Sequence, residues 1–189
     1  MRNLALPILA IFTLILLSIA CKKHVIQPQS ELSKLPPATQ TGANTFGCLV
    51  NGQAFTPQDK SIFEGPVLQC NYIYTAGGYY FTLLVGNKNS DNSVTGVNIE
   101  TDSLAISEGQ NIPLKIYSSG NAQGSYVVYY NTGGQNAYET NNAVTGQLII
   151  TKFDAIKQIV SGTFYFDAIN DKGDIMKITN GRFDMQYTK

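Results

Sequence analysis

The sequence predicts an all-β fold, and more specifically an antiparallel β-sandwich of about ten strands. From Asn44 onward, short runs rich in β-branched and aromatic residues are separated by clusters of Gly, Asn and Asp. Apolar and polar residues alternate within several of these runs, which is the pattern of half-buried strands. No amphipathic stretch is long enough for a substantial helix. The alternative architecture is a flattened up-and-down barrel built from the same strands.

Turn residues separate the predicted strands. Asn51-Gly52 is a strong two-residue hairpin signal, and Gly77-Gly78 divides the third run from the fourth. In chain order the runs are Thr45–Val50, Gln53–Thr56, Val67–Tyr74, Tyr79–Val85, Val94–Glu100, Ile112–Tyr117, Ser125–Tyr130, Val144–Phe153, Ile159–Ile169, Asp174–Thr179 and Arg182–Tyr187.

The last run shows the clearest alternation, because Phe183, Met185 and Tyr187 share one side of the strand and polar residues share the other. Asn180-Gly181, just before it, allows two interpretations, a hairpin turn or a β-bulge within one long strand. The bulge is favoured because Asn170–Gly173 already supplies the preceding turn. Both interpretations place the same apolar residues in the core.

Composition narrows the function classes. The 189 residues carry no net charge, and only 14% of them are charged. A nucleic-acid-binding protein needs a basic surface that neutralises phosphates, so we expect no nucleic-acid partner. The hydrophobic content of 43% is enough to fill a core, which argues against disorder.

The N-terminus has the layout of an export signal. Arg2 precedes the apolar run Leu4–Ile19, which is shorter than the ~20 residues that span a bilayer and ends just before Ala20-Cys21. It is similar to a bacterial lipoprotein signal peptide. The resemblance implies that residues 1–20 are removed and that Cys21 becomes the first residue and carries the lipid anchor. The membrane is then a partner of the protein through Cys21.

Residues 21–43 are predicted to form a flexible tether, and residues 44–189 the all-β domain. The tether segment, residues 21–43, contains Pro28, Pro36 and Pro37 and shows no sustained hydrophobic period. The single histidine of the chain, His24, lies in this tether and has no catalytic or metal-binding partner nearby in the sequence.

Two parts of the domain resemble a group of uncharacterised lipoproteins from Bacteroidota. Thr41–Gly52 is similar to the opening of these proteins, and Ser161–Phe164 followed by Ile178–Asp184 is similar to their C-terminal pattern. The resemblance implies an all-β lipoprotein of the cell envelope and supplies no activity. Surface export in such lipoproteins accompanies acidic residues after the lipidated cysteine. Lys22 and Lys23 stand there instead, which favours the periplasmic side of the outer membrane over the cell surface.

Cys48 and Cys70 remain once Cys21 is set aside. Both fall in predicted strands, and two states are open. A disulfide would close a loop worth on the order of 3 kcal/mol in the chain-entropy model. The alternative is a pair of buried free thiols that pack as small apolar residues.

Few residues of the domain can support catalysis. The predicted domain contains no histidine. This excludes His-based catalytic triads and Cys-His dyads, and it disfavours zinc, copper and non-haem iron sites. No phosphate-binding loop is present. We therefore predict a protein with no catalytic residues, no metal and no cofactor. The enzymatic alternative is a carboxylate-dependent hydrolase, which needs two acids facing a cleft. Its candidate acids are Glu100, Asp154, Asp167 and Asp184.

Tyrosines beside loops rich in Gly and Asn are the candidate ligand contacts. Exposed tyrosine rings stack on sugar rings, whereas inward-facing ones are structural strand residues. The sequence thus predicts a lipid-anchored envelope protein with a non-catalytic role in binding or envelope assembly, through a glycan or a protein partner. The alternative within binding is a carbohydrate-recognition accessory protein. The candidate contacts are Tyr79, Tyr80, Tyr129, Tyr130 and Tyr138.

Overall fold

The computed structural model describes residues 30–57 and 68–189, and this part of the chain is all-β. It contains eleven strands and one short 3-10 helix, η1 (Glu31–Lys34). No helix in these residues is long and apolar enough to cross a membrane. The predicted fold class is confirmed.

The strands match most of the predicted runs. The short strand β8 falls in a segment expected to be a loop, and the last two predicted runs form one strand, β11. The strands are β1 (Thr45–Val50), β2 (Gln53–Phe55), β3 (Leu68–Thr75), β4 (Gly78–Lys88), β5 (Val94–Thr101), β6 (Asn111–Leu114), β7 (Ala122–Tyr129), β8 (Gln135–Glu139), β9 (Gly146–Asp154), β10 (Ile159–Ile169) and β11 (Ile175–Gln186).

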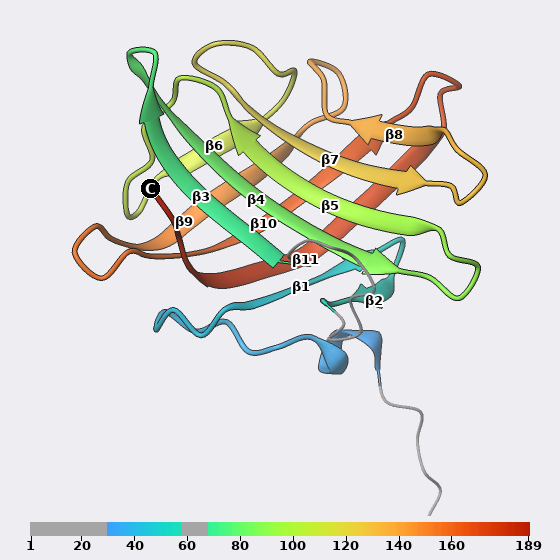
Figure 1. The fold of residues 1–189 in the computed structure, drawn as a ribbon, viewed down its shortest axis with the longest axis horizontal. Helices are drawn as coiled ribbons and strands as arrows, with labels where there is room; N and C mark the ends of the chain where they lie inside the picture. The colour runs from blue at the N-terminus through green and yellow to red at the C-terminus, as the bar shows by residue number, and fades with distance from the viewer. Residues whose placement is uncertain (1–29, 58–67) are drawn as a thin grey trace, which may run out of the picture.

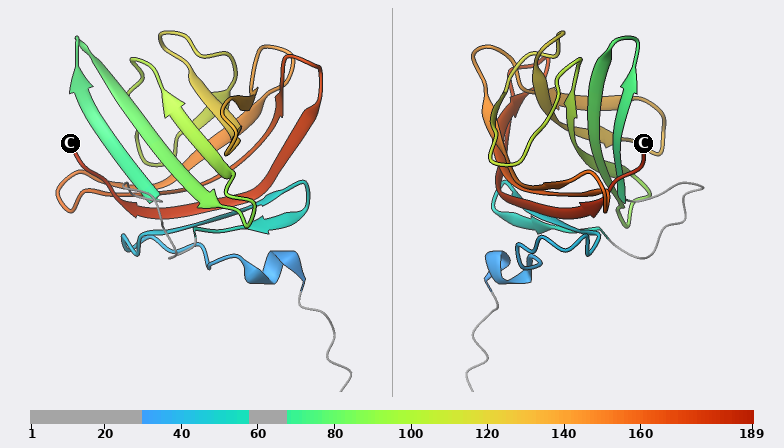
Figure 2. Two further views of the ribbon diagram at one scale, coloured as in Figure 1. Left: turned by 45° about the vertical axis from the view of Figure 1, so that its right-hand side comes forward. Right: turned by 90° about the vertical axis from the view of Figure 1, so that its left-hand side faces the viewer.

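All eleven strands belong to one mixed sheet with the order β2-β1-β11-β10-β9-β6-β7-β5-β4-β3, and β8 pairs with both β7 and β10. Neighbours are antiparallel except β6 and β7, which are parallel. The sheet folds over on itself, so that β3, β4 and β5 lie across from β9, β10 and β11 (Figures 1 and 2). The result agrees with the predicted sandwich and does not close into a regular barrel.

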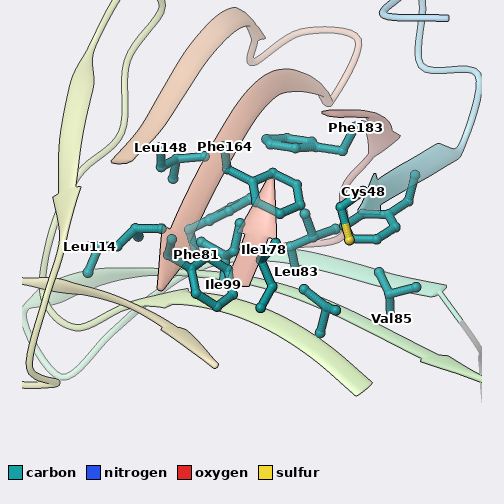
Figure 3. Close-up of a cluster of buried hydrophobic side chains, with 14 of the residues drawn as sticks. Cys48, Phe81, Leu83, Val85, Ile99, Leu114, Leu148, Phe164, Ile178 and Phe183 are labelled. Atoms are coloured by element: carbon teal, nitrogen blue, oxygen red, sulfur yellow. The ribbon is translucent and has the colours of Figure 1, made fainter. Parts of the chain in front are cut away.

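The core fills the space between these two parts of the sheet (Figure 3). Alternate residues of β4 point inward, among them Phe81 and Leu83, and they meet inward side chains of β10 and β11. The rings of Phe81 and Phe183 lie 6.1 Å apart, and Phe183 in turn lies 6.4 Å from Phe164. Burial of these aromatic and aliphatic faces holds the folded-over sheet together.

Strand β11 contains the predicted bulge. Phe164 of β10 pairs with Gly181, whereas Phe166 pairs with Ile178, so that β11 has one residue more than its partner between these pairs. Asn180 adopts a left-handed conformation with φ of 53°. The bulge corrects the alternation and keeps Ile178 and Phe183 in the same core, as predicted.

Residues 30–43 are part of the folded domain, which corrects the predicted tether. Residues 21–29 lie outside the described residues, but the N-terminal strap, residues 35–43, crosses the outer side of the sheet (Figure 1). Leu35 is buried, and Pro36 packs so closely on Gly47 that a Cβ at Gly47 would lie 2.6 Å from the Pro36 ring. The folded domain therefore begins at least fourteen residues before the predicted boundary at residue 44.

The strap is held by one buried carboxylate, that of Asp184 in β11. Backbone N–H groups of Gly42 and Thr41 donate to it at 2.7 and 2.9 Å. The hydroxyl of Thr39 donates at 2.7 Å, and that of Ser161 in β10 at 2.8 Å. Two weaker bonds at 3.2 Å, from the Thr41 hydroxyl and the Ala43 N–H, bring the donors to six. Burial by itself would raise the pKa of Asp184, but these hydrogen bonds outweigh it and hold the pKa well below its usual range.

We expect Asp184→Asn to lower the free energy of unfolding by about 2–4 kcal/mol, because the amide cannot accept from all of these donors and leaves buried N–H groups unpaired. The folded-state pKa of Asp184 is lowered, so its contribution is complete above the unfolded pKa of about 3.9 and is lost as the pH falls below it. Denaturant unfolding between pH 3 and 7 measures both effects. Asp167→Asn is the control, since Asp167 is half-exposed and its ion pair with Lys177 is long, at 3.8 Å. An equal loss in both variants would contradict the role assigned to Asp184.

Candidate functional site

The two ends of the folded sheet meet at a seam between β3 and the C-terminal residues that follow β11. The Tyr72 N–H donates to the Thr188 carbonyl at 2.8 Å, and the Thr188 N–H donates to the Cys70 carbonyl at 3.0 Å. Beside these bonds lies an open groove of about 760 Å³, which we call the seam groove. It lies between the first residues of β3, the end of β11 and the turn that connects β9 to β10.

Amide side chains dominate the polar lining of the seam groove, and among the described residues Lys157 is the one charged residue that lines it. The carbonyl oxygen of the Asn44 side chain is engaged, because it accepts from the Gln186 N–H at 2.9 Å. The side-chain amides of Gln69, Gln158 and Gln186 have no hydrogen-bond partner within the described residues. Each of these amides offers both donors and an acceptor to a ligand.

An aromatic cluster adjoins the groove and consists of Tyr72, Tyr74, Tyr79, Phe153 and Tyr187. Tyr72 is its centre: its ring stacks on Tyr79 at 5.1 Å and meets Phe153 and Tyr187 edge-on at 5.3 and 5.8 Å. Tyr187 is 3% exposed and also lines the seam groove, whereas Tyr74, 4.8 Å from Tyr79, is 63% exposed. The cluster therefore runs from the wall of the groove to the surface at the β3–β4 hairpin.

The inner tyrosines of the cluster are fixed in place and neutral. Burial raises the pKa of Tyr72, whose hydroxyl accepts a hydrogen bond from the Ile106 N–H at 3.3 Å. Burial also raises the pKa of Tyr187. Both phenols therefore stay protonated at physiological pH and can donate a hydrogen bond.

The structure does not bring the five predicted tyrosines together. Tyr79 belongs to the aromatic cluster, but Tyr80 points to the other face of β4 and hydrogen-bonds the Ser103 hydroxyl at 3.0 Å. Tyr129 and Tyr130 are exposed near the far end of β4, about 30 Å from Tyr79 by strand register. Tyr138 is buried, and its hydroxyl bonds the Asn136 amide.

Sequence reasoning missed most of the aromatic cluster. Tyr72 and Tyr74 come from β3, Phe153 from β9 and Tyr187 from the residues after β11, and only the folding of the sheet brings these three segments together. Alternation did assign Tyr187 to the inner face with Phe183, and the structure places it there.

The disulfide between Cys48 and Cys70 is not formed, so the second of the two open states is the observed one. Both cysteines are free and buried in the hydrophobic core. Burial raises the pKa of each thiol to about 12, which keeps both protonated and unreactive. The two cysteines lie on strands that do not pair with each other, since β1 pairs with β2 and β11 whereas β3 pairs with β4. Cys21, the predicted lipidation site, and His24 lie outside the described residues.

The four candidate acids of a hydrolase are dispersed over different strands. Asp184 binds the strap, Asp167 pairs with Lys177, and Asp154 accepts from the backbone of the turn that follows it. Burial, and then the nearby Glu139, raise the pKa of Glu100 on the outer face of β5. None of the four lines the seam groove, and no group of three or more metal-ligating side chains occurs in the described part of the chain.

Comparison with known proteins assigns a family and no activity. DUF6252, a domain family of unknown function, matches residues 74–185, and the chain belongs to this family. No curated protein and no solved structure matches the chain. The matched stretch includes the exposed half of the aromatic cluster and the Asp184 carboxylate.

Proposed function

We propose that this DUF6252 protein is a lipid-anchored protein of the cell envelope that binds a neutral carbohydrate without turning it over. The observation that carries the proposal is the contact between the seam groove and the aromatic cluster. Unpaired amides on one side and exposed rings on the other are the two kinds of group that a sugar requires.

The chemistry of the groove supports a neutral, hydroxyl-rich ligand. Each free amide of Gln69, Gln158 and Gln186 can donate to one hydroxyl and accept from another. Beyond the groove, at the β3–β4 hairpin, Tyr74 and Tyr79 offer apolar ring faces that can cover the C–H face of a further sugar ring of an oligosaccharide. A volume of about 760 Å³ lies within the range of small-molecule sites. No carboxylate of the described residues lines the groove, and a glycosidase would need two, so binding is favoured over the hydrolase alternative.

The placement of the site supports its role in an anchored protein. The chain enters the domain through η1, on the opposite side of the sheet from the β3–β4 hairpin that carries Tyr74 and Tyr79 (Figure 2). The resemblance of residues 1–21 to a lipoprotein signal, and of the domain to lipoproteins of Bacteroidota, provides the anchor at Cys21. The chain between Cys21 and Ser30 spans at most about 30 Å. The aromatic cluster would then face away from the membrane, on the periplasmic side of the outer membrane.

A glycan array followed by calorimetry tests the binding proposal on full-chain protein in detergent. We expect a neutral glycan to bind, and Tyr79→Ala or Gln158→Ala to weaken its affinity about tenfold, through loss of ring stacking or of hydrogen bonds. Tyr129→Ala is the matched control, because Tyr129 is a similarly exposed tyrosine at the far end of the sheet. Absence of binding to any glycan, or an equal loss in the Tyr129 variant, would refute the proposal.

Mass spectrometry of the protein expressed in a bacterium with lipoprotein processing tests the anchor. The mature chain should begin at Cys21 and carry the mass of its acyl chains. The Cys21→Ser variant should no longer be found in the membrane fraction. Two or three acyl chains give stable attachment, whereas a single chain binds reversibly with K of ~10⁴ M⁻¹. An unmodified Cys21 in the membrane-bound protein would contradict the assignment.

A further inference from the structure

A second hollow lies on the outer face of the sheet and shares no lining residue with the seam groove. It has a volume of about 420 Å³ and forms where β9, β10 and β11 lie side by side. Ala38 of the N-terminal strap contributes to its lining, and Arg182, Tyr165 and Gln147 supply its polar and aromatic groups.

The β-bulge in β11 lies within this hollow. Thr179 and Asn180 together oppose the single residue Tyr165, since the flanking pairs are Phe164 with Gly181 and Phe166 with Ile178. A bulge interrupts the even row of side chains, bends the strand and redirects the residues beside it. Asn180 and Gly181 line the hollow, and Arg182 follows directly after them.

Arg182 brings a positive charge that no described residue balances. Its Nε donates to the Asn180 carbonyl at 3.4 Å, and no carboxylate of the described residues lies within 4.0 Å of its guanidinium. Asp184, two positions along the strand, uses its carboxylate to accept from the strap and from Ser161. Arg182 is of intermediate exposure, so its guanidinium is available to pair with an anionic ligand.

The neighbours of Arg182 indicate what the anion is attached to. Thr163 pairs directly with Arg182 across the two strands, and Tyr165, 54% exposed, stands two residues farther along β10. Diagonal neighbours of this kind are about 7–8 Å apart, which matches an anionic group on one edge of a six-membered ring. Gln147 pairs with Tyr165 from β9 and adds an amide for hydroxyl groups.

We propose that this outer hollow binds a sugar acid, with the Arg182 guanidinium on its carboxylate and the Tyr165 ring on its pyranose face. A planar guanidinium fits a carboxylate through two parallel hydrogen bonds. Thr163 and Gln147 then contact the hydroxyl groups. This site is separate from the seam groove and does not depend on the function proposed for that groove.

Ligand-observed saturation-transfer NMR on the full-chain protein tests the proposal with three probes: galacturonate, galactose and inorganic phosphate. Galacturonate should bind at least about tenfold more tightly than galactose, because a charge-assisted hydrogen bond is worth about 1.5–3 kcal/mol. Arg182→Gln should remove this preference, and Tyr165→Ala should weaken galacturonate binding. Lys177→Gln should change neither, since Lys177 lies on the same strand but pairs with Asp167.

Three results would overturn the proposal. They are no galacturonate binding at millimolar concentration, unchanged binding in Arg182→Gln, and phosphate binding as tight as galacturonate binding. The last result would assign the hollow to small anions in general. Thermal unfolding of each variant verifies its fold, and if Arg182→Gln fails to fold, Arg182→Lys with galacturonate and phosphate provides the same comparison.

Discussion

Two backbone hydrogen bonds join the ends of this sheet, and the candidate site depends on them. They connect Tyr72 and Cys70 of β3 to Thr188, and they fix the side chain of Tyr187 against Tyr72. Without them β3 would be a free edge strand, exposed to pairing with other chains. With them, the edge is partly covered, and the remaining opening becomes a groove lined by amides and bordered by aromatic rings.

The features that follow from local pattern could be predicted from the sequence. Alternation placed Phe183 and Met185 in the core, and the turn residues before the last strand favoured a bulge at Asn180, which the structure contains. The strand β8 was missed because its residues, Gln135–Glu139, are mostly polar and stand beside a glycine pair typical of loops.

The features that depend on distant pairing could not be predicted. The strap was assigned to a tether because its prolines and polar residues carry no period, and its order comes from Asp184, more than 140 residues away. Alternation showed only that Asp184 is on the outer face, where a solvated carboxylate is the usual expectation. In the same way, Phe153 and Tyr187 joined the hairpin tyrosines Tyr72, Tyr74 and Tyr79 only once the sheet had folded over. The sequence left the disulfide open because both cysteines fall in predicted strands, and the structure shows both thiols free and buried.

The two faces of β11 carry different side chains. The inner face carries Phe183 and Met185, followed by Tyr187, whereas the outer face carries Arg182, Asp184 and Gln186. The low charge of the chain makes this contrast clear, because an uncompensated guanidinium stands out on a surface of mostly amide and hydroxyl groups. The bulge preserves the core alternation of Ile178 and Phe183, and Asn180 and Gly181 line the hollow beside Arg182.

Amide hydrogen exchange at Tyr72 and Thr188, followed residue by residue by NMR, tests the seam most directly. The account predicts slow exchange at both N–H groups, similar to that of the neighbouring paired residues of β3 and β4, because each donates to a backbone carbonyl. Exchange at the rate of an exposed edge or a frayed terminus would show that the seam is open in solution, and the groove and its aromatic border would then lose the geometry on which the proposed binding depends.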